Sequence, residues 1–224
     1  MQKRKIIIGT YDTALEGLWT LSGWTLSRAE ANEEYASVPG HHGALDLSTA
    51  LTDGEPFYNT REFEATLESS EGSRLEREER INQMVNRLDG WRFNIILPDD
   101  PMHYISGRVR VEKQFNTPAH ASVRVSAVCD PWRYNAGETV VSVSATTSEQ
   151  TVALINNGRL SVVPTIRVSG GSVTLKFTTG EASRTWTLGA GEYILADIYV
   201  KTGSAPVTYK GSGTITFTYR EAVL

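Results

Sequence analysis

The sequence has few of the residues from which catalytic and metal sites are usually built. It contains one cysteine, Cys129, and four histidines in 224 residues. A single cysteine excludes an intramolecular disulfide, so we expect a fold that does not depend on an oxidising compartment. In "SVRVSAVCD" its neighbours alternate as in a strand, which predicts a small buried hydrophobic side chain rather than a reactive thiol.

Long apolar runs and a strong excess of positive charge are also missing. The apolar run after the basic start is only Ile6 to Ile8, well short of the about 7–15 residues of a secretory signal. No stretch approaches the roughly 20 apolar residues of a membrane span. The formal net charge is −4, which excludes the positive field that holds nucleic-acid phosphates. We therefore expect a chain that folds in the cytoplasm, with no membrane or nucleic-acid partner.

The chain changes character near Asn135, where a mixed, charge-rich part gives way to one rich in Thr, Val, Ser and Gly. We expect an N-terminal domain over 1–135 and a C-terminal domain over 136–224, with residues 213–224 able to return to the first domain. The first domain should contain one helix at about 73–89. Its signals are a capping box, Ser73 with Glu76, and an apolar stripe of Ile81, Met84, Val85 and Leu88. The charge run "EREER" is interpreted as a solvated helix face.

Short alternating runs surround this helix and fill the rest of the chain. Several antiparallel strands with one helix predict an α+β, barrel- or sandwich-like first domain. In the second part, short strands at about 8–12-residue spacing, separated by Gly or Asn turns, predict a β-sandwich. The fold class expected is therefore mainly β.

Three groups of residues are tempting as chemical sites. The adjacent His41 and His42 point to opposite faces if extended, so they are a poor pair of metal ligands. Ser48 with Asp46 and His42 lacks the elbow of a nucleophilic serine. Asp99 and Asp100 are interpreted as solvent-facing residues of a hairpin turn. We therefore expect no catalytic, metal-binding or cofactor-binding residues, and a protein that is not an enzyme.

Two stretches, "VPGHHGALDLSTAL" and "PFYNTREFEATLES", resemble the pattern of the siphophage distal tail proteins. In that family a Pro-Gly-x-x-Gly-x-x-Asp turn precedes a strand that carries Tyr-x-x-Arg. Similar segments follow the helix and close the first domain. The matching residues are Pro39, Gly40, Gly43, Asp46, Tyr58, Arg61, Gly90, Asp99, Tyr104, Gly107, Arg108, Pro131 and Tyr134. We expect Gly40 and Gly43 to be required for positive φ or for close approach of the backbone.

The resemblance implies a virion structural protein of a phage or prophage tail tip. Family members form a homo-hexameric ring that joins the tail tube protein to the tail-associated hub or lysin protein and supports receptor-binding parts. The second domain is then a galectin-like sandwich. In a ring, residues 28–57 are expected to lie as a belt across the neighbouring subunit, with Leu45, Leu47 and Leu51 as interface candidates. An ordinary surface loop packed on its own domain is the alternative for this stretch.

A second function class stays open on the residues alone. The C-terminal sandwich would bind a host cell-surface glycan if it exposed several aromatic side chains along a groove. The candidates are Trp186, Tyr193 and Tyr199. The five tryptophans are otherwise expected to fill the cores.

Overall fold

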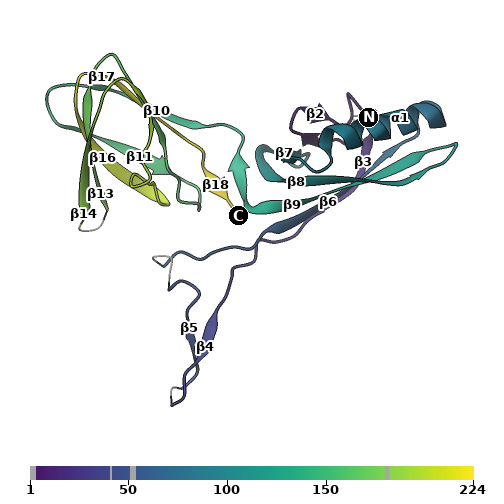
Figure 1. Ribbon diagram of the computed structural model, residues 1–224, viewed down its shortest axis with the longest axis horizontal. Coiled ribbons are helices and arrows are strands. Elements are labelled where there is room, and N and C mark those ends of the chain that lie inside the picture. Colours follow the sequence, from purple (N-terminus) through teal and green to yellow (C-terminus); the bar gives the residue numbers. More distant parts are fainter. Residues whose placement is uncertain (1–3, 41, 51–53, 180–181) are drawn as a thin grey trace. The chain divides into compact units, whose positions relative to one another are not determined.

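The computed structural model describes residues 4–40, 42–50, 54–179 and 182–224. The chain divides into two compact units, residues 1–133 and 134–224 (Figure 1). Among the described residues, no helix is long and apolar enough to span a membrane. Each unit has its own hydrophobic core, so each is described by itself below.

The first unit contains short N-terminal strands, one helix and three long strands. Its elements are β1 (Ile7–Ile8), β2 (Tyr11–Asp12), β3 (Thr20–Leu26), β4 (Tyr35–Ser37), β5 (Ala44–Asp46), β6 (Arg61–Ser69), α1 (Arg74–Leu88), β7 (Arg92–Leu97), β8 (Asp100–Asn116) and β9 (Ala121–Asn135). The main sheet runs in the order β2-β1-β7-β8-β9-β6-β3, and β4 and β5 form a separate two-stranded ribbon.

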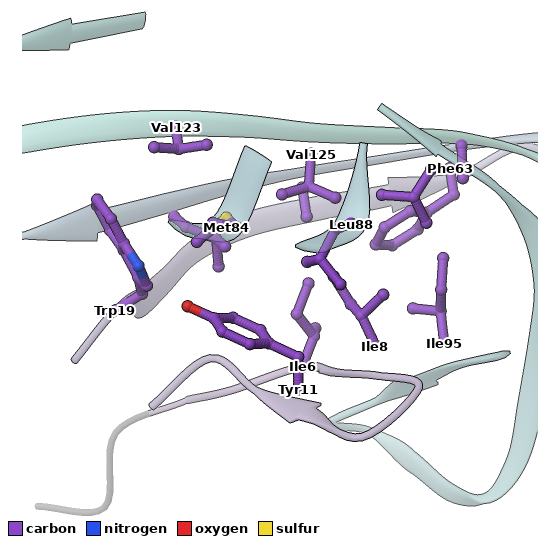
Figure 2. Packing of buried hydrophobic residues seen from close by; sticks show 14 of the residues in the cluster. Ile6, Ile8, Tyr11, Trp19, Phe63, Met84, Leu88, Ile95, Val123 and Val125 are labelled. Carbon is purple, nitrogen blue, oxygen red and sulfur yellow. The ribbon is translucent and has the colours of Figure 1, made fainter. Parts of the chain in front are cut away.

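The helix covers one face of this sheet, and the core lies between them. Alternate residues of β6, such as Phe63 and Leu67, are buried, and the residues between them are exposed. Figure 2 shows Met84 and Leu88 of α1 among side chains from the strands and the N-terminal segment. Trp19 is fully buried in the same cluster. The opposite face of the sheet carries the charged residues of β6, β8 and β9, together with the exposed Val128.

The helix begins where the capping box predicts. The Ser73 side chain accepts from the backbone N–H of Glu76, and the Glu76 carboxylate accepts from the backbone N–H of Ser73. Gly90, just beyond the helix, has a φ of +79°. The apolar stripe faces the core, with Val85 only partly buried.

One expectation about this helix is wrong. Arg77 belongs to the charge run interpreted as solvated, yet it is 1% exposed. It lies four residues before Ile81, so it falls on the core side of the helix. Its guanidinium is accommodated there because backbone carbonyls of two loops surround it.

The second unit is a sandwich of two four-stranded sheets, ordered β10-β17-β12-β15 and β11-β16-β13-β14. Its strands are β10 (Thr139–Ala145), β11 (Gln150–Asn156), β12 (Thr165–Ser169), β13 (Val173–Thr179), β14 (Ala182–Leu188), β15 (Gly191–Ile194), β16 (Gly203–Gly211), β17 (Gly213–Tyr219) and β18 (Ala222–Val223). Ile166, Leu175 and Phe217 contribute to one core between the sheets. The predicted mainly β class with one helix and a C-terminal sandwich is confirmed for the described residues.

The sequence pattern missed β16, because the stretch "GSAPVTYKG" contains Pro206 and glycines. Pro206 pairs with Ala153 of β11, but the pairing with β13 begins only at Val207. The strand therefore has one paired neighbour at the proline, which is where a missing N–H is tolerated.

Near the end of the chain, β17 lies within the second unit, where it is paired between β10 and β12. β18 pairs with the end of β9, where the backbone N–H of Asn135 donates to the carbonyl of Glu221 at 2.9 Å.

Candidate assembly surface

Residues 28–57, called the arm from here on, leave the main sheet between β3 and β6. Figure 1 shows β4 and β5 in this two-stranded extension. Among its described residues, none is buried, and none belongs to the hydrophobic core of the first unit. An isolated two-stranded ribbon is marginally stable in water. The arm therefore contains ordered backbone without the buried apolar surface that usually stabilises it.

The two faces of the arm differ in polarity. Ala36 is paired with Leu45, so their side chains share a face, and Val38 and Leu47 follow two residues later on the same face. Leu45, Leu47 and Val38 are each about two-fifths exposed, at 39%, 40% and 40%. The other face carries Tyr35, Ser37, Ala44 and Asp46. One face of the arm is thus an apolar stripe from both strands.

Hydrogen bonds fix the register that creates this stripe. The backbone N–H of Leu47 donates to the carbonyl of Glu34 at 2.8 Å, and the N–H of Glu34 donates to Ser48 Oγ at 2.8 Å. Asp46 Oδ1 accepts from the backbone N–H of Ser48 at 2.9 Å. Hydrogen bonds from the Ser48 side chain and backbone lower the pKa of Asp46. Ser48 and Asp46 therefore act as turn residues of the arm.

The turn between β4 and β5 depends on glycine conformation. Gly40 and Gly43 have φ of +82° and +83°, and a Cβ at either position would meet no atom within 4 Å. The positive φ predicted at both is present, and close approach of the backbone is not its cause. Pro39 lies in the same turn, and His42 is exposed. His41 and Leu51 lie outside the described residues.

The root of the arm is held by the Tyr-x-x-Arg motif. Arg61 Nε donates to the carbonyl of Ser27 at 2.7 Å, where the chain enters the arm. Tyr58, where the chain returns, packs edge-on against Trp132 of β9, with ring centroids 5.4 Å apart. Ser27 is also paired with Glu62 through backbone and side-chain hydrogen bonds. The motif thus fixes both ends of the arm to the main sheet.

Arg61 itself is buried, with 8% exposure, opposite Cys129 of β9. Burial, together with the nearby positive charge of Arg133, lowers the pKa of Arg61. Its Nη1 has no hydrogen-bond partner among the described residues. Arg61 is a structural cation at the end of the core.

The remaining motif residues have structural environments in β8 and β9. A Cβ at Gly107 would lie 2.5 Å from Cys129 Sγ and 2.7 Å from the carbonyl of Val128, so close approach explains this glycine. Arg108 donates to the carbonyl of Gly90. Pro131 and Tyr134 lie in β9. Burial raises the pKa of the Cys129 thiol to about 11, as expected of an unreactive buried cysteine.

The described residues hold no cluster of three or more potential metal ligands. The expectation that Asp99 and Asp100 both face solvent is wrong for Asp100. Asp99 pairs with Arg4 at the surface, whereas Asp100 contacts His103 at 2.6 Å and Arg133 at 3.2 Å. The difference arises because Asp100 already belongs to β8 and turns toward the neighbouring strand.

The aromatic residues of the second unit give no exposed platform among its described residues. Trp186 and Tyr193 pack against the core of the sandwich, and Tyr199 lies edge-on to Phe177 at 6.2 Å. The strongly exposed tryptophan is Trp91 in the first unit, at 67%, which contradicts the expectation that tryptophans fill the cores. Trp91 lies at the turn after α1, where its backbone N–H donates to the carbonyl of Leu88 and its carbonyl accepts from the N–H of Val109 in β8.

Comparison with solved structures identifies a full-length match. The crystal structure of SPP1 Dit, described as a paradigm of the hub adsorption apparatus in phages that infect Gram-positive bacteria, superposes with a TM-score of 0.70. The chain has the fold of SPP1 Dit. The match covers 100% of each chain at 16% sequence identity. Neither protein-family models nor curated proteins match the sequence.

The shared Dit fold includes both units, because the match extends over the whole of each chain. At the level of fold it confirms the resemblance to the siphophage distal tail proteins that the turn and strand motifs indicated. The sequence reasoning named Leu45 and Leu47 in the arm but missed Ala36 and Val38. The alternation of apolar residues on both sides of the Pro-Gly turn is the sequence signal that could have identified Ala36 and Val38.

Proposed function

We propose that this chain is a structural protein of a siphophage or prophage tail tip, and that its first unit forms a homo-hexameric ring. The ring connects the tail tube to the tail-associated hub protein and supports the parts that attach to the host. The observation that carries the proposal is the full-length match to SPP1 Dit, a phage hub protein, at a TM-score of 0.70.

The arm supports the ring, because its apolar stripe needs a surface that its own unit does not supply. Ala36, Val38, Leu45 and Leu47 lie on one face and are at least partly exposed. In a closed ring each subunit presents one surface to the next and receives a different one in return. We assign the arm as the donated surface, with Leu45 and Leu47 as its anchors.

Charge also favours an arm that binds a neighbour. The arm holds one arginine and six acidic residues, a formal net charge of −5, whereas the whole chain is −4. The rest of the chain is therefore at +1, so an arm that lies on a neighbouring body does not bring two strongly like-charged surfaces together. Two whole chains, each at −4, repel at long range, and salt screens that repulsion.

The test is the mass of the purified full-length protein by light scattering, with electron microscopy of the particles. Leu45→Asp with Leu47→Asp should leave a folded monomer with native circular dichroism and no hexamer, because desolvated anchors carry most of an interface's free energy. Ser37→Asp with Ala44→Asp adds the same two charges to the other face and should keep the ring. If the first pair leaves the ring mass unchanged, the arm is not the ring contact. If wild type forms no ring alone or with the tail tube protein, the proposed function is wrong.

A further inference from the structure

A groove crosses the outer face of the main sheet, which is the face that α1 does not cover (Figure 1). Its volume is about 420 Å³, and it runs over the neighbouring strands β3, β6, β9 and β8. Its lining includes no described residue of the arm, so a single subunit leaves the groove open. The lining residues are 25–27, 62–64, 126–128, Arg108 and Arg110.

The cations of this outer face differ in their partners. Arg124 forms an ion pair with Glu64 at 3.1 Å, and Arg108 donates to the carbonyl of Gly90. Arg110 is exposed in the groove, and its guanidinium has no hydrogen bond or ion pair with another described residue. Arg110 is therefore the cation of the groove that is available to an anionic partner.

Val128 supplies an apolar surface beside this cation. Its side chain is 57% exposed. On one side it is paired with Glu62 of β6, and on the other side the neighbouring strand is β8, which carries Arg110. Across the strands the groove thus presents a carboxylate, an apolar side chain and a guanidinium. A carboxylate that approaches Val128 is repelled by Glu62 and attracted by Arg110, which fixes the direction in which an acidic partner lies.

The arm carries a matching pair of groups. The backbone N–H of Leu47 donates to the carbonyl of Glu34, so the two residues lie opposite each other and their side chains share a face. Glu34 is exposed, and its carboxylate has no partner among the described residues. Tyr35 and Asp46, the next pair along the ribbon, face the other way. Glu34 is therefore a free acid at the end of the apolar stripe.

We propose that the groove receives the arm of a second copy of this chain, with Leu47 over Val128 and the Glu34 carboxylate bound to Arg110. The inference rests on the proposed ring and names the surface that the donated arm meets. The Cα atoms of a hydrogen-bonded antiparallel pair are about 5.5 Å apart, and neighbouring strands of a sheet are about 4.8 Å apart. A leucine above β9 therefore brings the carboxylate beside it above β8.

The first test exchanges the two charges in the full-length protein and follows the hexamer by light scattering. Arg110→Glu and Glu34→Arg should each raise the concentration at which half of the chains are assembled by roughly tenfold or more, because the repulsion recurs at every interface of the ring. The variant with both changes should return to within about threefold of wild type. Glu33→Arg is the matched control, because it makes the same change one residue away, on the other face of the arm. It should assemble as wild type does.

The second test traps the contact with a disulfide. Chains with Leu47→Cys, co-expressed with chains with Val128→Cys, should give a covalent dimer on oxidation, and neither variant should give it alone. The native Cys129 is buried, so wild type is the blank.

Several results would overturn the inference while the ring stands. They are unchanged assembly of Arg110→Glu, a double charge variant that does not recover, and wild-type rings whose cysteine variants give no mixed dimer. A chain with both cysteines that closes on itself as a monomer would assign the groove to its own arm. If wild type forms no ring alone or with the tail tube protein, the proposed function fails first, and the inference fails with it.

Discussion

Replacement of Arg77 by methionine tests how much a buried cation with neutral partners contributes to the stability of the first unit. Methionine keeps much of the volume of the side chain but removes its donors. Three backbone carbonyls, of Gly72, Thr117 and Pro118, would lose their partner. Hydrogen bonds from a charged group contribute about 1.5–3 kcal/mol each. Relief of the desolvation of the cation offsets part of this loss, by several kcal/mol.

The expected net loss is about 3–5 kcal/mol of unfolding free energy, because three carbonyls lose a charged donor while the removal of a buried cation offsets only part of that loss. For a unit of 133 residues, at roughly 3 °C per kcal/mol, the melting temperature of the first unit should fall by about 10–15 °C. Because the two units need not unfold together, hydrogen exchange with mass spectrometry should follow each unit separately. Peptides over residues 112–121 should lose protection first, since this side chain holds the turn between β8 and β9 through the carbonyls of Thr117 and Pro118.

Arg74→Met is the matched control, because Arg74 lies in the same first turn of α1 and is exposed. Its expected effect is within about 0.5 kcal/mol. A loss below about 1 kcal/mol for Arg77→Met, or unchanged exchange of residues 112–121, would refute the argument that the guanidinium holds the turn between β8 and β9.

Two further outcomes depend on the contact between β8 and β9. Gly107→Ala should destabilise the first unit by about 2–4 kcal/mol in chemical denaturation, because its Cβ would meet Cys129 Sγ at 2.5 Å and the Val128 carbonyl at 2.7 Å. Gly43→Ala is the control, because that site has open space but a φ of +83°, and it should cost only about 1–2 kcal/mol. Equal losses of stability in the two variants would argue against the clash. Cys129 should resist iodoacetamide at pH 8 in the native protein and react on unfolding, because a thiol with a pKa of about 11 has roughly a thousandth of its population as thiolate at that pH; rapid native labelling would contradict its burial.

Several features were determined by the sequence because their physical causes are local. The helix is one: the capping box of Ser73 and Glu76 and the spacing of Ile81, Met84 and Leu88 act within a few turns. The alternation in β6 and in most strands of the sandwich is another, because a strand with one buried face has a period of two. The glycines of the arm's turn are a third, because positive φ is a property of single residues.

Only the tertiary structure decided the features that depend on partners far away in the sequence. The sequence pattern predicts that Arg77 is a surface charge. In the structure it is buried, because the carbonyls of residues 117 and 118, some 40 positions later, accept hydrogen bonds from it. The residues of β16 resemble a loop in the sequence. They form a strand because Pro206 lies where the strand has only one paired neighbour. The apolar stripe of the arm exists because the register of β4 and β5 places Ala36 beside Leu45. Hydrophobic period and propensity act over a few residues, whereas burial, pairing and register are set by contacts that close long loops of chain.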